Sequence, residues 1–277
     1  MTAPSPPPGE SDQAIELSLL APAHNEQDNV ERLVNEGGAA LAAAVGGGVG
    51  GTPRRFEFVI VDDGSTDQTR ARIAALIPGR PWLRCVAMTR TPPGRGNGQS
   101  AAFYAGVRAC RGRLIATLDA DLQNDPADLK AMVELMSSTG ADLVQGDRSH
   151  ARADNAIRKI TSRIGRLFRN LILADAVRDT GCSLRVMKRE VALQLPLQFK
   201  GMHRFIPITA VHLGYKVVEM PVHHRARVAG ETKYGFGIWQ RALPGLIDCF
   251  AVRWMSNRRR PTASAEISAA FSNGATR

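Results

Sequence analysis

The chain has 277 residues, of which 44% are hydrophobic and 22% charged, and its formal net charge at pH 7 is +10. This length and composition allow one large hydrophobic core and exclude a fibrous or wholly disordered protein. The positive charge indicates an anionic partner, and nucleic acid, nucleotide sugars and acidic lipids all fit it. The four cysteines are widely separated and form no Cys-x-x-Cys pair. We therefore expect buried thiols rather than a zinc site or a disulfide framework.

Residues 1–14 are predicted to form a flexible tail, because the segment MTAPSPPPGESD is rich in proline and precedes no apolar run. The segment also lacks the features of a signal peptide, which favours a cytosolic protein. No stretch approaches the roughly 20 apolar residues of a membrane span. The best candidate, residues 242–252, is interrupted by Pro244 and Asp248.

Short apolar, β-branched runs alternate with helical patterns as far as residue 145. Strands are expected over residues 17–23, 56–61, 83–88, 114–118 and 143–145. Helices are expected over residues 28–45, 68–77, 99–111 and 127–137. This alternation predicts an α/β fold with a mainly parallel central sheet, in which ligands bind at the carboxyl ends of the strands.

The sequence becomes strongly basic after residue 147. We expect a basic helix over 155–173, a turn and strand over 178–186, a helix over 202–213 and a strand over 216–222. The last predicted helix, 236–255, is followed by Arg258, Arg259 and Arg260. It fits either a helix lying on a membrane surface or one packed on the core with a solvated basic tail. The predicted organisation is a catalytic domain over 15–235, a membrane-surface helix over 236–260 and a flexible tail over 261–277.

Acidic side chains crowd the ends of three predicted strands. Glu26 follows the first strand, Asp62 and Asp63 follow the second, and Asp119 and Asp121 follow the fourth. Such crowding is costly unless a cation or hydrogen-bond donors neutralise the charge. A bound metal together with a base or ribose would do both.

The stretch LDADLQNDP, residues 118–126, places Asp119, Asp121 and Gln123 at alternate positions. In an extended backbone these side chains point to the same side. Such oxygen ligands suit Mg²⁺ or Mn²⁺, which complete their coordination with phosphate and water. A solvated turn in which Asp125 caps a helix starting at Pro126 is the more common explanation of such a stretch when it stands alone.

Three other motif assignments fail on particular residues. Gly46, Gly48 and Gly51 fit the letters of a dinucleotide-binding motif, but they follow a helix and precede a strand, which is the reverse of the required order. A P-loop is excluded because the chain has no Gly-Lys pair. An EF-hand is excluded because Asn124 and Lys130 stand where Gly and Glu are needed.

The motifs PAHNE, VDDGSTD, GNGQSAA, TLDADLQNDP, RDTGC, MHRFIP and RVAGETKYG occur in this order along the chain, with Arg148 and Arg152 between the fourth and the fifth. Together they resemble glycosyltransferase family 2, and most of all its dolichyl-phosphate mannose synthase-like branch. That branch includes bacterial enzymes that glycosylate polyprenyl phosphates. The resemblance covers roughly residues 15–255. It implies a GT-A fold and inverting sugar transfer from a nucleotide diphosphate donor, with Mg²⁺ or Mn²⁺ as cofactor.

The resemblance also implies roles for individual residues. Asp119, Asp121, Arg227 and Lys233 would form the catalytic set, with Asp121 and Gln123 as metal ligands. The donor would be bound by Pro22, Ala23, Asn25, Glu26, Asp62, Asp63, Asp119, Thr232 and Lys233. The acceptor phosphate would be bound by Arg148 and Arg163, and His203 is expected on the acceptor side.

The chain departs from the family pattern at three places. Arg95-Gly96-Asn97-Gly98-Gln99 replaces the usual Arg-Asn-Phe-Gly-Gln, and Thr232 replaces a serine while keeping the hydroxyl. Members of this branch often carry two carboxyl-terminal membrane spans, and none is predicted here. Membrane contact would then depend on residues 236–260 or on a partner subunit, at the inner face of the cytoplasmic membrane.

The residues favour a phosphate acceptor over a hydroxyl. A lipid monophosphate has a second pKa of about 6, so it needs positioning by arginines more than deprotonation. Hydroxyl acceptors need a general base, and Phe250 stands where Gln is expected in the Gln-x-x-Arg-Trp element that often accompanies them. A hydroxyl acceptor of a polysaccharide, lipid or protein remains the alternative. UDP-glucose, UDP-N-acetylglucosamine, UDP-galacturonic acid, UDP-aminoarabinose and GDP-mannose all fit as donors. Homo-oligomerisation is left open, and no nucleic-acid partner is expected.

Overall fold

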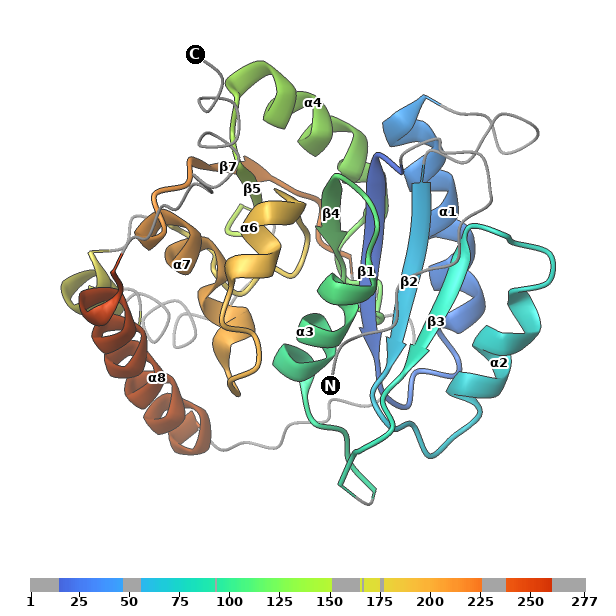
Figure 1. The fold of residues 1–277 in the computed structure, drawn as a ribbon, viewed down its shortest axis with the longest axis horizontal. Helices are drawn as coiled ribbons and strands as arrows, with labels where there is room; N and C mark the ends of the chain where they lie inside the picture. The colour runs from blue at the N-terminus through green and yellow to red at the C-terminus, as the bar shows by residue number, and fades with distance from the viewer. Residues whose placement is uncertain are drawn as a thin grey trace, which may run out of the picture.

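The computed structural model describes residues 15–46, 56–92, 94–150, 165, 167–174, 177–225 and 238–260. Seven strands form one sheet in the order β3-β2-β1-β4-β6-β5-β7 (Figure 1). The strands are β1 Leu17–Ala23, β2 Phe56–Asp62, β3 Leu83–Ala87, β4 Leu114–Thr117, β5 Leu143–Asp147, β6 Arg185–Lys188 and β7 Val217–Pro221. Only β6 runs antiparallel to its neighbours β4 and β5. The predicted mainly parallel sheet is confirmed.

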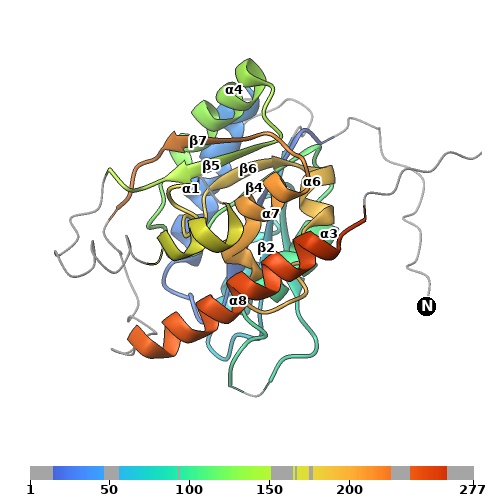
Figure 2. The same ribbon diagram turned by 90° about the vertical axis from the view of Figure 1, so that its left-hand side faces the viewer.

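Helices cover both faces of this sheet. They are α1 Val30–Val45, α2 Thr69–Leu76, α3 Gln99–Ala109, α4 Leu129–Thr139, α6 Arg189–Gln194, α7 Ile206–His212 and α8 Ile238–Arg258. Short 3₁₀ turns at Pro126–Asp128 and Met202–Phe205 precede α4 and α7. The helical residues 167–173 lie beside α8 (Figure 2).

Two hydrophobic clusters hold the layers together, one on each face of the sheet. The first joins α1 and α4 to the sheet through buried residues such as Leu33, Leu41 and Met132. The second joins α3, α6 and α7 to the opposite face, with Phe103 fully buried at its centre. Alternate residues of the central strands enter the two clusters, as expected of a sheet that is buried on both sides. The buried face of α8 packs onto the second cluster through Cys249 and Val252.

The predicted elements agree with the structure to within a few residues up to β5, and one difference matters for the site. The expected strand over 114–118 ends at Thr117, and Leu122 has a φ of 55°, so the stretch after β4 turns instead of staying extended. The helix α6 was not predicted, because its six residues are too few for a periodic pattern. Among the described residues, no helix has both the length and the apolar character to cross a membrane.

Candidate functional site

The loops after β1 and β2 are tied together by hydrogen bonds. Asn25, with a left-handed φ of 54°, accepts a hydrogen bond from the Thr66 amide at 2.8 Å, and its own amide donates to Ser65 Oγ at 3.1 Å. The Glu26 amide donates to Thr69 Oγ1 at 2.8 Å. Asparagine tolerates the left-handed region better than most residues, which explains its place at this sharp turn. The two loops therefore form one rigid edge, on which Asn25 and Glu26 are partly exposed.

The two aspartates at the end of β2 are buried rather than exposed. Asp62 is fully buried and accepts hydrogen bonds from the Ser65 amide at 3.1 Å and from Arg70 Nε at 2.6 Å. Asp63 accepts from the amides of Asn97 at 2.9 Å and Gly98 at 2.7 Å. In this structure both carboxylates hold loops in place. Their predicted contact with the base and ribose stays a prediction.

The loop passes very close to the Asp63 side chain at Gly96. A Cβ at Gly96 would collide with the Asp63 side chain. The loop can wrap closely around the Asp63 carboxylate because Gly96 has no side chain. The amides of Asn97 and Gly98 thus fix this loop on Asp63.

The alternating stretch after β4 keeps its alternation in a turned backbone. Ala120 and Leu122 are buried, whereas Asp119, Asp121 and Gln123 are partly exposed. The Gln123 amide donates to Asp121 Oδ1 at 3.2 Å, which closes a local turn. Three polar side chains thus remain partly exposed although the backbone is not a strand.

The alternative explanation of the same stretch, a capped turn, is present as well. Asp125 Oδ1 accepts from the Ala127 amide at 3.0 Å, and Pro126 takes the first helical position. Asp125 also pairs with Arg225, which joins this turn to the segment after β7. Asp125 is the capping residue, so helix capping does not account for Asp119 and Asp121.

Asp119 lies in an environment that disfavours its charged form. Burial, and then the charge of Asp121, raise the pKa of the Asp119 carboxyl above its usual range. Gln99 Nε2 donates to Asp119 Oδ1 at 2.5 Å, and Ser183 Oγ accepts from the Asp119 amide at 3.2 Å. A cation between the carboxylates would relieve this repulsion, so the residues present fit a divalent metal.

The protein alone does not complete such a metal site in the part of the chain described. No group of three His, Cys, Asp or Glu side chains among these residues is arranged to hold a metal ion. Mg²⁺ and Mn²⁺ commonly take only a few protein oxygens and complete their shell with substrate phosphate and water. Asp121 and Gln123 would hold the cation, and the donor diphosphate would supply further ligands.

A buried polar network lies behind the site, beyond Asp119. Arg185 is 2% exposed and donates through Nε to Gln145 Oε1 at 2.7 Å. Burial lowers the pKa of Arg185 to about 10, and nearby charges that include Asp119 act in the opposite direction. Ser183 ties the same region to β4, since its carbonyl accepts from Thr117 Oγ1 at 2.5 Å. These hydrogen bonds hold the buried residues next to Asp119 in place.

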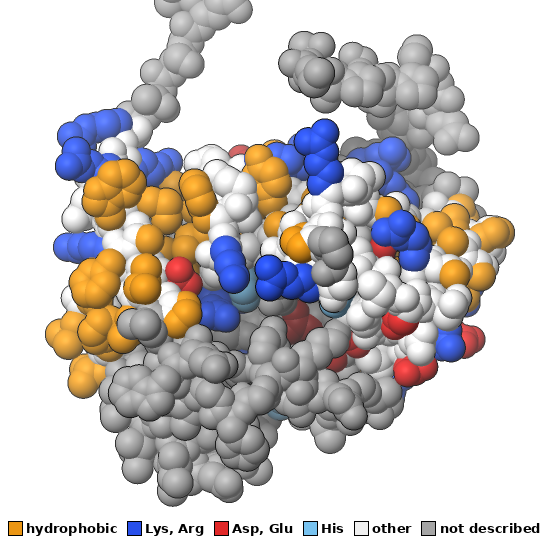
Figure 3. All heavy atoms as spheres, turned by 90° about the horizontal axis from the view of Figure 1, so that it is seen from below, with side chains coloured by type: hydrophobic (Ala, Val, Ile, Leu, Met, Phe, Trp, Pro, Cys, Tyr) orange, Lys and Arg blue, Asp and Glu red, His pale blue; other side chains and the backbone are white. Residues whose placement is uncertain are grey.

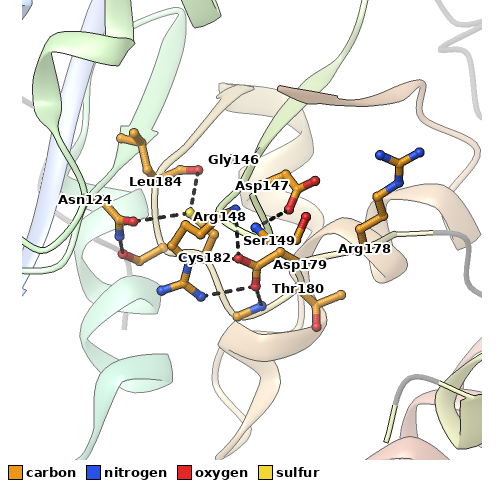
Figure 4. A network of polar contacts seen from close by, with 12 residues as sticks. Asn124, Gly146, Asp147, Arg148, Ser149, Arg178, Asp179, Thr180, Cys182 and Leu184 are labelled. Atoms are coloured by element: carbon orange, nitrogen blue, oxygen red, sulfur yellow. Dashed lines mark hydrogen bonds and ion pairs between the residues drawn. The ribbon is translucent and has the colours of Figure 1, made fainter. Parts of the chain in front are cut away.

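Arg148 lies in a buried ion pair (Figure 4). Its Nε and Nη2 donate to the two carboxylate oxygens of Asp179 at 2.8 and 3.1 Å, and its amide donates to the same carboxylate at 3.2 Å. Burial alone would lower the pKa of Arg148, but the hydrogen bonds and charge of Asp179 raise it above the ordinary value. The guanidinium therefore positions the turn at Asp179, and its predicted contact with an acceptor phosphate stays untested.

His203 lies next to the first turn of α3. Its amide donates to Ser100 Oγ at 3.1 Å, and its Nδ1 lies 2.8 Å from the same oxygen. Burial, and then the charges of Arg204 and Arg185, lower the pKa of His203 to about 3. The ring is therefore neutral near pH 7 and is a weak base. Since Gln99 contacts Asp119, α3 links the carboxylate pair to His203.

Several predicted site residues lie outside the described part of the chain, namely Arg163, Arg227, Thr232 and Lys233. Pro22 and Ala23 lie at the end of β1, half-buried and buried respectively. Sequence reasoning missed the roles of Gln99, Ser100, Ser183 and Arg185. Gln99 and Ser100 lie in the motif GNGQSAA, which is shared with the family, and could have been singled out, but nothing local marks the other two.

Comparison with known proteins identifies the family. The sequence model described as "Glycosyl transferase family 2" matches residues 18–195. The chain belongs to glycosyltransferase family 2. The expected family is thereby confirmed, and the chain is a glycosyltransferase.

Two curated relatives are similar to this chain over most of its length. The dodecaprenyl-phosphate galacturonate synthase of Rhizobium johnstonii is 36% identical over 252 residues, which are 90% of this chain and 70% of that protein. The undecaprenyl-phosphate 4-deoxy-4-formamido-L-arabinose transferase of Edwardsiella ictaluri is 33% identical over 233 residues, 84% of this chain and 67% of that protein. Both relatives are named as polyprenyl-phosphate sugar transferases.

Two solved enzyme structures have the same fold as this chain. Glucosyl-3-phosphoglycerate synthase from Mycobacterium tuberculosis, in complex with Mn²⁺, UDP-glucose and phosphoglyceric acid, superposes with a TM-score of 0.61 at 18% identity over 85% of this chain and 80% of that one. A mannosyltransferase from Pyrobaculum calidifontis with GDP-mannose and Mn²⁺ gives a TM-score of 0.57 at 18% identity, over 90% and 66% of the two chains. The GT-A fold is confirmed.

Proposed function

We propose that this glycosyltransferase moves a sugar, with inversion, from a nucleotide diphosphate donor to a polyprenyl phosphate. The observation that carries the proposal is the Asp119 and Asp121 pair after the carboxyl end of β4, where burial, and then the charge of Asp121, raise the pKa of Asp119. Two carboxylates that interact electrostatically suit a divalent cation that bridges to a diphosphate. The pair lies beside the rigid loop edge after β1 and β2, where parallel α/β sheets bind nucleotides.

In the proposed reaction, different residues would bind the nucleotide, the cation and the leaving diphosphate. Asn25 and Glu26 present partly exposed polar groups at the nucleotide edge, and the buried Asp62 and Asp63 keep that edge rigid. Asp121 and Gln123 would hold Mg²⁺ or Mn²⁺. When bound, the cation would neutralise charge that builds on the departing nucleoside diphosphate. Lys233 and Arg227, from the family signature, would add positive charge to the same leaving group.

The proposed acceptor follows from the two relatives and from the chemistry of His203. A hydroxyl acceptor needs a base to take its proton, and a histidine with a pKa of about 3 takes a proton poorly. A phosphate monoester is already largely ionised near neutral pH and attacks through an existing anionic oxygen. The oxygen would bond to the anomeric carbon as the bond from that carbon to the diphosphate breaks. Arg163 and His203 would orient the phosphate.

The proposed acceptor is a membrane lipid, which places the enzyme at a membrane surface. We propose peripheral contact at the inner face of the cytoplasmic membrane, where nucleotide sugars are available. The contact would be made by the protein itself or through a membrane partner subunit.

A transfer assay with matched acceptors tests the proposal. Nucleotide sugars are first screened with Mn²⁺ for thermal stabilisation, because a bound donor stabilises the folded state. The stabilising donor is then incubated with a short-chain polyprenyl phosphate, with the corresponding polyprenol, or without acceptor. We expect a glycosyl phosphate product with the phosphate alone. Transfer to the polyprenol with no transfer to the phosphate would contradict the acceptor assignment.

A further inference from the structure

The helix α8 exposes an apolar stripe on the side that faces away from the core. Ile247, Phe250 and Trp254 are 59, 59 and 62% exposed and recur at helical spacing, so they share one face of the helix. The opposite face is also apolar, because Cys249 and Val252 are buried in the core. The helix therefore packs on the domain and still presents a second apolar face.

A second helix extends this stripe. Leu167 and Leu171, one helical turn apart, are 62 and 77% exposed, while Leu173 is buried. Phe168 contacts Phe250 edge to face with ring centroids 6.1 Å apart, which joins the two helices side by side. Figure 3 shows hydrophobic side chains gathered over α8 on the left of the molecule. We call the five exposed residues the apolar face: Leu167, Leu171, Ile247, Phe250 and Trp254.

Positive charge accompanies the apolar face at the end of α8. Arg253, Arg258, Arg259 and Arg260 are exposed. The Arg258 guanidinium carbon lies 6.0 Å from the centroid of the Trp254 ring, so the charge begins where the apolar stripe ends. An apolar stripe edged by cations matches the boundary between acyl chains and anionic headgroups, and tryptophan favours the same depth.

The helix that carries the apolar face also lies against the acceptor side of the site. A Cβ at Gly201, where φ is 87°, would collide with the Asp248 carboxylate. Gly201 is two residues from His203, which contacts Ser100 at the start of α3. A surface resting on lipid would thus bring the lipid headgroups close to the residues assigned to the acceptor phosphate.

We propose that the apolar face and its arginines dock directly on an anionic lipid bilayer, with α8 and the helical residues 167–173 lying in the plane of the interface. This inference rests on the proposed function in one respect, since docking would deliver a membrane-embedded polyprenyl phosphate to the His203 side. The occupant is a lipid surface because the face combines apolar residues with clustered positive charge.

Vesicle binding of the full chain tests the docking without any assay of transfer. We compare the wild type with the triple variant Ile247→Ser, Phe250→Ser and Trp254→Ser on vesicles of phosphatidylcholine with phosphatidylglycerol. The triple variant should still melt cooperatively, with a melting temperature lowered by a few degrees at most because the Phe168–Phe250 contact is lost. It should lose at least about tenfold in vesicle affinity. In a background with Trp82→Phe and Trp239→Phe, Trp254 is the remaining tryptophan, and its fluorescence should shift to the blue on vesicles and be quenched by brominated lipid.

A charge-matched pair of variants tests the arginines. Arg258→Gln with Arg259→Gln should weaken binding to anionic vesicles by about fivefold per arginine. The control, Arg72→Gln with Arg80→Gln, removes the same charge from the α2 side at the opposite edge of the molecule (Figure 1) and should bind like the wild type. Equal weakening by both pairs would show nonspecific attraction and would overturn the proposal.

The remaining outcomes separate the docking surface from the reaction. Vesicle binding by the wild type without transfer to any polyprenyl phosphate would leave the surface intact and remove the proposed function. Wild-type vesicle affinity in the triple variant would overturn the surface. A lipid-free dimer that dissociates in the triple variant, with no vesicle binding by the wild type, would assign the face to a second copy and also overturn it. We expect the triple variant to retain transfer to a water-soluble short-chain acceptor and lose transfer to a full-length acceptor in vesicles.

Discussion

Ser100 Oγ bridges the backbone and the ring of His203, with the His203 amide at 3.1 Å and Nδ1 at 2.8 Å. We infer that the Ser100 hydroxyl, which accepts from the His203 amide, donates to Nδ1. A neutral ring then carries its proton on Nε2. Ser100 therefore acts as a positioning residue that presents an N–H group from His203.

Substitutions that mimic one ring nitrogen at a time check this arrangement. His203→Gln keeps an N–H near the Nε2 position and should retain most activity, whereas His203→Asn should not. Ser100→Ala should lower kcat/KM for the acceptor by about 2- to 12-fold, the equivalent of one neutral hydrogen bond. The KM of the donor should not change. Nitrogen NMR of the wild type should show the Nε2–H tautomer, and an Nδ1–H signal would contradict the assignment.

The carboxylate pair gives a prediction about metal dependence. Asp121→Ala should lower kcat by at least about 100-fold, because the leaving diphosphate loses its bound cation. Asp121 is partly exposed, so the fold should survive. Calorimetry with Mn²⁺ and a nucleoside diphosphate should show binding to the wild type and none to the variant. Near-normal turnover by a folded Asp121→Ala variant would refute the metal assignment.

The raised pKa of Asp119 predicts a gain in stability when its charge is removed. A carboxyl whose pKa is higher in the folded state binds more protons there, so stability falls as pH rises from the unfolded pKa through the folded one. When a chelator has removed divalent metal at pH 7, Asp119→Asn should raise the melting temperature by a few degrees. With metal present, the variant should have lost transfer activity. The gain should vanish below the usual aspartate pKa of about 3.9. A lower melting temperature at pH 7 would show that the carboxylate is stabilising.

The loop around Asp63 predicts an effect on donor binding. In Gly96→Ala the new Cβ collides with the Asp63 carboxylate and displaces the amides of Asn97 and Gly98. We expect a loss of about 1–3 kcal/mol in stability and a higher KM for the donor. Gly79→Ala is the matched control, since nothing lies within 4 Å of its Cβ. Equal behaviour of both variants in thermal melts and donor titrations would show that the close approach is unimportant.

The sequence predicted the parts of the fold that depend on local pattern. The strands β1 and β2 and the helix α3 appear within two residues of their expected bounds, because alternation and helical periodicity are local signals. The insertion of β6 between β4 and β5 was not predicted. The pairing of distant strands depends on tertiary packing, which no local pattern encodes.

The same distinction between local patterns and long-range contacts applies to the site. Asp119 and Asp121 were found because alternating carboxylates after a strand are a local feature. The contact of Ser100 with His203 joins residues 103 positions apart, and the contact of Asn124 with Ser183 joins residues 59 apart. Such pairs carry no signal in a single sequence. Arg148 was expected to face a phosphate, and its burial against Asp179 became visible only in the folded chain.

The Arg148 and Asp179 pair gives a prediction that separates a positioning role from an acceptor-binding one. Both side chains are less than 10% exposed, so removing one partner leaves a buried charge without its counterion. Arg148→Ala should cost about 3–5 kcal/mol in the free energy of unfolding. The double variant Arg148→Met with Asp179→Leu removes both charges and should recover most of that loss.

Transfer activity of the double variant then decides the role of Arg148. If Arg148 only holds the turn at Asp179, the restored fold should recover the KM of the acceptor along with the melting temperature. If the guanidinium also binds the acceptor phosphate, the double variant should melt like the wild type and keep a raised acceptor KM. Denaturant unfolding and acceptor titrations on the four proteins of this cycle measure both quantities. Because the guanidinium already contacts both Asp179 oxygens, we expect the first result.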